Sequence, residues 1–91
     1  MIEEVKEAFG VLQRVLEGTG ESSAEFMFMG GSSNARGEEI LLFKHISTRR
    51  YLNVGHDGEF YRYVPMPVYK PGVPPVYEPV DRKWALRHVQ G

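Results

Sequence analysis

Residues 40–64 concentrate side chains that could bind a partner or act on a substrate. They include four of the eleven Lys and Arg residues, two of the three histidines and three of the five tyrosines. A rigid β-ribbon that displays such residues offers a partner both positive charge and flat apolar rings. We expect the binding face to be formed by Lys44, His45, Arg49, Arg50, Tyr51, Asn53 and Arg62.

The charge of the chain is distributed unevenly along its length. Residues 1–39 carry three basic and eight acidic groups, a charge of −5, whereas residues 40–70 carry five basic and two acidic groups, a charge of +3. Such asymmetry can steer an anionic partner to one face of a protein. The formal net charge of −1, however, argues against a protein built mainly to hold nucleic acid.

Several kinds of catalytic and metal chemistry find no support in the sequence. The chain has no cysteine, which excludes disulfides, thiolate catalysis and cysteine-ligated zinc. The three histidines, His45, His56 and His88, form no recognised metal pattern. The Gly-Gly-Ser-Ser segment at residues 30–33 lacks the spacing and the following lysine of a phosphate-binding loop. We therefore predict no metal and no cofactor, and we favour a non-enzymatic function while leaving enzymatic activity open.

Two nucleic-acid functions remain as alternatives. Tyrosines interleaved with arginines can stack on the bases of single-stranded RNA or DNA. Histidine, arginine, lysine and tyrosine on a sheet can also support metal-free cleavage of RNA, because cations stabilise the charge of the transition state. Both alternatives use the same basic and aromatic face with Tyr61 added to it, and the stacking alternative also uses Tyr63.

The first element that must support this face is a helix. The chain of 91 residues makes one domain, 1–91, because it has no room for a second core. Ile2, Val5, Phe9, Leu12 and Leu16 recur at helical spacing, which predicts an amphipathic helix within residues 1–18. Its polar face is acidic, unlike that of most membrane-surface helices, and we expect no membrane association.

An antiparallel meander is predicted over residues 24–64. Apolar or alternating runs predict strands at residues 24–29, 39–46, 50–54 and 59–64, with a Gly/Ser-rich loop over 30–37. The fold class is therefore α+β, with the helix packed on a sheet of about four strands.

The side to which each residue of the last hairpin belongs depends on the turn at Asp57-Gly58. A two-residue type I′ turn would place Leu52, Val54, Tyr61 and Tyr63 in the core and leave Tyr51, Asn53 and Arg62 exposed. A three-residue turn with a bulge at Gly58 would shift the register by one residue and overturn this assignment. The sequence leaves both turns open.

The C-terminal third begins with a proline-rich arm over residues 65–80. Residues 65–79 contain all six prolines, and the pattern Pro-Val-Tyr-x-Pro occurs at 67–71 and again at 75–79. We expect an extended arm, partly polyproline II, that turns back at Pro71-Gly72. A short helix capped by Asp81, or a strand, follows at 81–91. Tyr69, Tyr77 and Trp84 are expected at an interface.

Together these features predict a small soluble binding or accessory protein. It would act through protein–protein or small-ligand contacts. Self-association as a homodimer would add buried surface to its small core. Its cysteine-free composition fits a cytoplasmic location. The alternative is a nucleic-acid-directed protein that uses the arginine, tyrosine and histidine face of the hairpin.

Overall fold

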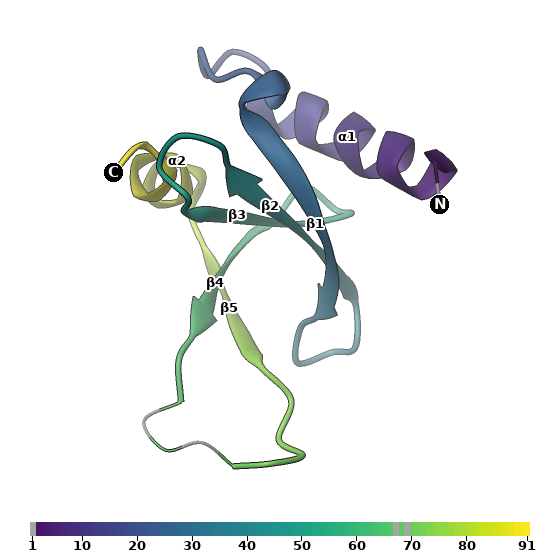
Figure 1. Cartoon of the computed structure of the whole chain (residues 1–91), viewed down its shortest axis with the longest axis vertical. Helices are drawn as coiled ribbons and strands as arrows, with labels where there is room; N and C mark the ends of the chain where they lie inside the picture. The colour runs from purple at the N-terminus through teal and green to yellow at the C-terminus, as the bar shows by residue number, and fades with distance from the viewer. Residues whose placement is uncertain (1, 67, 69) are drawn as a thin grey trace.

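A computed structural model describes residues 2–66, 68 and 70–91. It contains a five-stranded antiparallel sheet and two helices, which confirms the α+β class (Figure 1). The sheet has one strand more than the four predicted, and its strands lie side by side in chain order. In that order they are β1 (Phe26–Ser33), β2 (Glu39–His45), β3 (Tyr51–Gly55), β4 (Phe60–Val64) and β5 (Val76–Val80). The helices are α1 (Ile2–Leu16) and α2 (Arg82–Gln90), and a 3-10 turn, η1 (Ser23–Glu25), precedes β1. Neither helix is long and apolar enough to cross a membrane.

Helix α1 forms where the apolar spacing predicts it. Two glutamates lie in its first turn, where the helix dipole favours negative charge. Gly18, with a φ of +74°, follows its last turn. The stripe of Val11, Leu12 and Leu16 is buried, whereas Ile2 is 76% exposed. The first turn of the helix therefore contributes little to the core.

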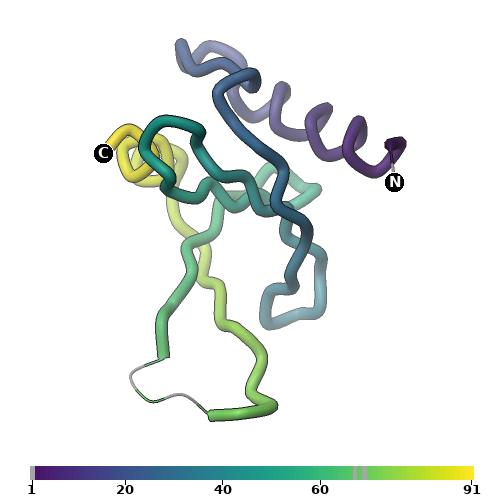
Figure 2. Tube along the Cα trace, viewed as in Figure 1, coloured from purple at the N-terminus to yellow at the C-terminus, as the bar shows by residue number. Residues whose placement is uncertain are grey.

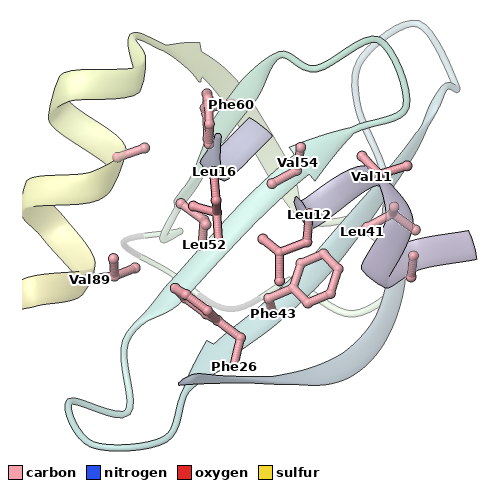
Figure 3. Packing of buried hydrophobic residues seen from close by; sticks show 12 residues of the cluster. Val11, Leu12, Leu16, Phe26, Leu41, Phe43, Leu52, Val54, Phe60 and Val89 are labelled. Atoms are coloured by element: carbon pink, nitrogen blue, oxygen red, sulfur yellow. The ribbon is translucent and has the colours of Figure 1, made fainter. Parts of the chain in front are cut away.

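The hydrophobic core lies between one face of the sheet and the helices α1 and α2, and Figure 3 shows Val89 of α2 as part of it. Phe43 at its centre is fully buried, and its ring meets the rings of Phe9 and Phe28 at centroid distances of 5.5 Å each. Edge-to-face contacts of this kind stabilise a core beyond simple burial. Leu52 and Val54 from β3 fill the same layer and are buried as predicted. We call this side of the sheet the covered face.

Strand β1 extends further than the sequence indicates. Residues 30–33, predicted as a loop, continue the strand and pair with β2. The register shifts between Phe28 and Gly30, so that Met29 forms a β-bulge. Gly30 makes this irregularity easy because its φ of +112° is open to glycine. The bulge also breaks the strict alternation that sequence patterns require.

The β3–β4 hairpin closes through a three-residue turn, so the two-residue alternative at Asp57-Gly58 is wrong. The backbone N–H of Gly55 donates to the Glu59 carbonyl (2.8 Å), and that of Gly58 donates to the Gly55 carbonyl (3.0 Å). Gly58 has a φ of +86°, as the last position of this kind of turn requires.

The observed register changes the side to which several residues belong. The pairs are Asn53–Tyr61 and Val54–Phe60. Tyr63, predicted in the core, is 49% exposed, and Asn53, predicted to face solvent, is only 4% exposed. The Tyr63 error follows from a shift of one residue, which exchanges the two faces of β4. Asn53 stays on the predicted side of β3 but is buried there, between its cross-strand neighbours Leu42 and Tyr61.

The second half of the predicted proline-rich arm is strand β5. It pairs with β4 along its whole length, and Figures 1 and 2 show the two strands as a ribbon that projects from the body of the molecule. Pro79 is tolerated because β5 is an edge strand of the sheet that the described residues form, so one of its sides is not paired within that sheet. The predicted fold-back is confirmed, since Val73 N–H donates to the Lys70 carbonyl (3.3 Å) across Pro71 and Gly72. Tyr69 lies outside the described residues.

Strands β3 and β4 diverge beyond their short pairing. Residues 51–55 all pair with β2, but only residues 53 and 54 stand opposite β4. Helix α2 packs against both strands. Asp81 caps this helix, because its carboxylate accepts the N–H of Trp84 (2.7 Å). Of the two alternatives predicted for residues 81–91, the helix is therefore the one that forms. We call the divergence of β3 and β4 the β3–β4 fork.

Candidate binding site

A hollow of about 650 Å³ lies at the β3–β4 fork, between the sheet and α2. We call it the aromatic hollow. It is lined by Leu42, Arg50, Tyr51, Leu52, Asn53, Tyr61, Arg62, Tyr63, Tyr77, Trp84, Ala85 and His88. Its volume falls within the range of about 300–1,000 Å³ that is typical of sites for small molecules.

Six aromatic rings form most of the wall of this hollow. The rings of Tyr63 and Tyr77 lie 5.6 Å apart on neighbouring strands, and those of Trp84 and His88 are stacked at 5.0 Å on one side of α2. Tyr51 and Trp84 are 38% and 41% exposed, so their rings are accessible from solvent. A flat apolar group can therefore be received between sheet and helix.

Asn53 supplies a polar group at the fork. Its side-chain N–H donates to the Tyr61 carbonyl (3.3 Å), at the point where the backbone pairing ends. This contact fixes the orientation of the amide, since only the nitrogen can donate. The Oδ1 atom of Asn53 is buried and has no hydrogen-bond partner among the described residues. Such a group destabilises a fold unless a bound water or a ligand donates to it.

The two arginines of the hollow are already engaged. Arg62 forms a hydrogen-bonded ion pair with Glu78 on β5, directly opposite it. Arg50 Nη1 donates to the carbonyl of His88 (3.3 Å) in the last turn of α2. There its positive charge also complements the negative end of the helix dipole. Both cations are thus directed toward the protein itself.

The connection between β2 and β3 holds the C-terminal end of α2 in place. Thr48 Oγ1 donates to the Val89 carbonyl (2.6 Å), next to the bond that Arg50 makes. Partial burial lowers the pKa of His88, and the nearby Arg50 guanidinium lowers it further. The neutral imidazole is therefore favoured where His88 stacks on Trp84.

The structure brings together only part of the predicted binding face. Arg50, Tyr51, Asn53 and Arg62 line the hollow, and so do Tyr77 and Trp84, which were expected at a separate interface. Lys44 and Arg49 are not among the lining residues. Arg49 is exposed in the β2–β3 connection, where it takes a φ of +65°.

His45 does not face a partner, contrary to the prediction. It is 6% exposed, and its ring packs edge-on against Phe26 at 5.1 Å. Its Nδ1 accepts the backbone N–H groups of both Ser47 and Thr48, each at 3.2 Å. His45 therefore shapes the turn that leads to β3.

His45 also belongs to a group with the spacing of metal ligands. In the described part of the chain, candidate ligand atoms of Glu21, Glu25 and His45 all lie within 4.8 Å of one another. Because Nδ1 of His45 accepts two N–H groups, the hydrogen of the neutral ring is on Nε2, which faces Glu25 (3.4 Å). A metal would need a lone pair on Nε2, so Nε2 instead directs its N–H toward the Glu25 carboxylate.

Several residues of the hollow were absent from the predicted binding face. A two-residue turn places Tyr61 and Tyr63 in the core, whereas the observed turn brings both to the fork. Leu42 follows the apolar pattern of any central strand. His88 joins the site only because α2 returns to the fork. The available signal for this part of the site was the pair of tyrosines in β4.

A second hollow of about 500 Å³ adjoins the first, since Tyr61 and Tyr77 line both. We call it the polar hollow. Its other lining residues are Asn34, Ala35, Arg36, Asp57, Glu59 and Pro79. Tyr61 is therefore shared: its ring belongs to both walls, and its hydroxyl accepts the side-chain N–H of Asn34 (3.2 Å).

Comparison with known proteins gives no relative: no family model, no curated protein and no solved structure matches this chain.

Proposed function

We propose that this protein binds a small, flat, largely apolar ligand in the aromatic hollow and catalyses no reaction. The observation that carries the proposal is the wall of six aromatic rings around a volume of about 650 Å³. Sites for small molecules are mostly apolar and contain a few polar groups that fix orientation. Asn53 provides such a group at the fork.

The buried oxygen of Asn53 favours a ligand that donates a hydrogen bond. An N–H or O–H group on the ligand ring would give Oδ1 the partner that the described residues do not provide. Since Oδ1 is covered, its cross-strand neighbours Leu42 or Tyr61 must shift slightly to admit the donor. A ring without a donor would bind less well, because the oxygen would stay unsatisfied.

The ionisable groups of the hollow support binding better than catalysis. No carboxylate is among the described residues that line it, and both arginines are engaged by protein acceptors. His88 is held in a ring stack, and the same set of lining residues includes no serine or threonine to act as a nucleophile. General acid–base or nucleophilic catalysis requires such a pair within hydrogen-bond reach.

Titration with indole and 1-methylindole tests the proposal. The two probes have the same fused rings, but only indole has an N–H donor. Trp84 is the only tryptophan, so the NMR signal of its indole N–H reports directly on the hollow. We expect both probes to shift this signal and indole to bind about tenfold more tightly, the effect of one satisfied buried acceptor.

Two variants make this experiment specific. Trp84→Ala removes an exposed ring of the wall and should abolish binding of indole. In this variant, binding is monitored by the NMR signals of Asn53 and Tyr61. Met29→Ala, at an exposed position of β1 outside the hollow, should leave binding unchanged. Absence of any shift with indole at millimolar concentration, or equal loss in both variants, would refute the proposal.

Binding of single-stranded nucleic acid is the second candidate. Neighbouring rings such as those of Tyr63 and Tyr77 could stack on successive bases. The engaged arginines weigh against it, because they have less charge to offer to phosphates. A short oligonucleotide titrated at low and high salt decides the matter: binding that weakens steeply with salt would support this candidate over the first.

Self-association through the β4–β5 ribbon is a further part of the proposal. The ribbon and its loop expose Tyr63, Val68, Val73 and Val76. Pairing with a second copy would cover these side chains and enlarge a small core. Light scattering at high concentration should give the mass of a dimer, and a monomer mass would contradict it. The cytoplasmic location stays a prediction from composition.

A further inference from the structure

The polar hollow extends the aromatic hollow toward two carboxylates. Asp57 and Glu59 lie in its wall, in the turn between β3 and β4. Neither residue forms an ion pair with any residue of the described ranges 2–66, 68 and 70–91. A ligand that fills the aromatic hollow and continues past Tyr61 would meet their negative charge.

The carboxylate of Asp57 lies next to the ring that divides the two hollows. A Cβ built on Gly55 would stand 2.7 Å from Asp57 Oδ1 and 3.2 Å from Tyr61 Cε2, so this glycine lets the two side chains approach. Asp57 Oδ1 accepts the backbone N–H of Glu59 (2.9 Å), and this bond fixes the position of the carboxylate.

The one cation among the described residues of the polar hollow is neutralised by a neighbour. Arg36 Nε lies 2.9 Å from the carboxylate of Glu38, which contributes most to raising the pKa of Arg36. Asp57 contributes to that shift too, but least, so Asp57 and Glu59 together leave an excess of negative charge among the lining residues of the polar hollow. In the aromatic hollow, Arg62 and Arg50 are held by Glu78 and by the end of α2.

We propose that the ligand is a cationic aromatic amine, with its ring in the aromatic hollow and its ammonium group beside Asp57 and Glu59. This inference depends on the proposed function, because the ring must first occupy the aromatic hollow. It also uses the preference of Asn53 Oδ1 for a donor, which an aromatic N–H or O–H satisfies. The local charge thus favours a cation, although residues 40–70 are basic as a whole.

Three indole derivatives with different tails test the inference. Tryptamine has an ammonium group, indole-3-acetate has a carboxylate, and indole has no charged tail. We expect tryptamine to bind about fivefold more tightly than indole and indole-3-acetate to bind more weakly than indole, since partly exposed charges act with modest strength. Dissociation constants follow from the shift of the Trp84 signal.

Matched variants locate the effect. Asp57→Asn combined with Glu59→Gln should remove the preference for tryptamine while indole binds as before, because the amide oxygen introduced at position 57 can still accept the N–H that shapes the turn. Glu3→Gln combined with Glu4→Gln removes the same charge from the exposed first turn of α1 and should preserve the preference. Equal binding of all three probes, or a preference for indole-3-acetate, would overturn the inference and leave the proposed function standing. Failure of every probe to bind would instead refute the proposed function.

Discussion

The two faces of the sheet are built from different residues and serve different ends. The covered face consists of phenylalanine and aliphatic side chains such as Phe43, Leu52 and Val54, all with at most 1% of their surface exposed. The face at the fork consists mainly of tyrosines, and Tyr51 and Tyr63 are 38% and 49% exposed. Tyrosine has an apolar body and a polar tip, so it can line a hollow that water and ligand both reach.

The comparison extends to the buried polar residue of each face. His45 lies on the covered side, and its Nδ1 accepts two backbone N–H groups. Asn53 lies at the fork, and its Oδ1 has no partner in the described part of the chain. A satisfied polar group specifies the fold, whereas an unsatisfied one reduces stability and marks a site. The fork therefore presents a buried acceptor that the described residues leave open.

Phe43→Ala should have the largest effect, because it empties the centre of the covered face. We expect the free energy of unfolding to fall by about 3–5 kcal/mol, the usual loss for a buried phenylalanine. Tyr63→Ala on the other face should cost less than about 1 kcal/mol. Urea unfolding followed by circular dichroism measures both. Similar losses in the two variants would remove the distinction between the faces.

His45→Phe tests the satisfied polar group. A phenyl ring can still pack against Phe26, but the N–H groups of Ser47 and Thr48 lose their acceptor. The free energy of unfolding should fall by about 1–3 kcal/mol. Glu25→Gln, which keeps an acceptor for the Ser22 N–H but removes the charge that faces Nε2, should cost less than about 1 kcal/mol. An unchanged stability of His45→Phe would show that the N–H groups find water instead.

Asn53→Leu tests the unsatisfied group and should act in the opposite direction. The change removes a buried oxygen without a partner among the described residues, at the expense of one hydrogen bond to Tyr61. We expect the free energy of unfolding to stay equal or to rise by up to about 2 kcal/mol, while indole binds more weakly. A clear loss of stability would show that Asn53 serves the fold, as His45 does.

The smallest effect concerns pH and His88. Since the folded state lowers the pKa of His88, the unfolded chain takes up the proton more readily. Stability should therefore be complete above the unfolded pKa of about 6.5 and decrease as the pH falls through the lower folded pKa. His88→Gln should remove this part of the pH dependence. Urea unfolding of the unchanged protein and of the variant at several pH values measures the difference. An identical pH dependence in the variant would contradict the assignment.

Much of the architecture could be predicted because it depends on local signals. The apolar stripe of α1, the cap at Asp81 and the turn at Pro71-Gly72 each rest on a few neighbouring residues. The fifth strand was missed because prolines in residues 65–79 resemble an extended arm. An edge strand accepts proline on its unpaired side, and only the pairing with β4 shows that this place is available.

The candidate site was harder to predict, because it depends on a register. The sequence by itself determined the residue types of the site: tyrosines alternating along the hairpin, Asn53 within β3, and the Arg and Trp that flank them. Only the tertiary structure decided which of them meet. The three-residue turn shifted every residue of β4 by one place relative to the predicted register. The short pairing of β3 with β4 left the fork against which α2 packs. Side chains alternate with a period of two along a strand, so a single residue in a turn exchanges core and surface.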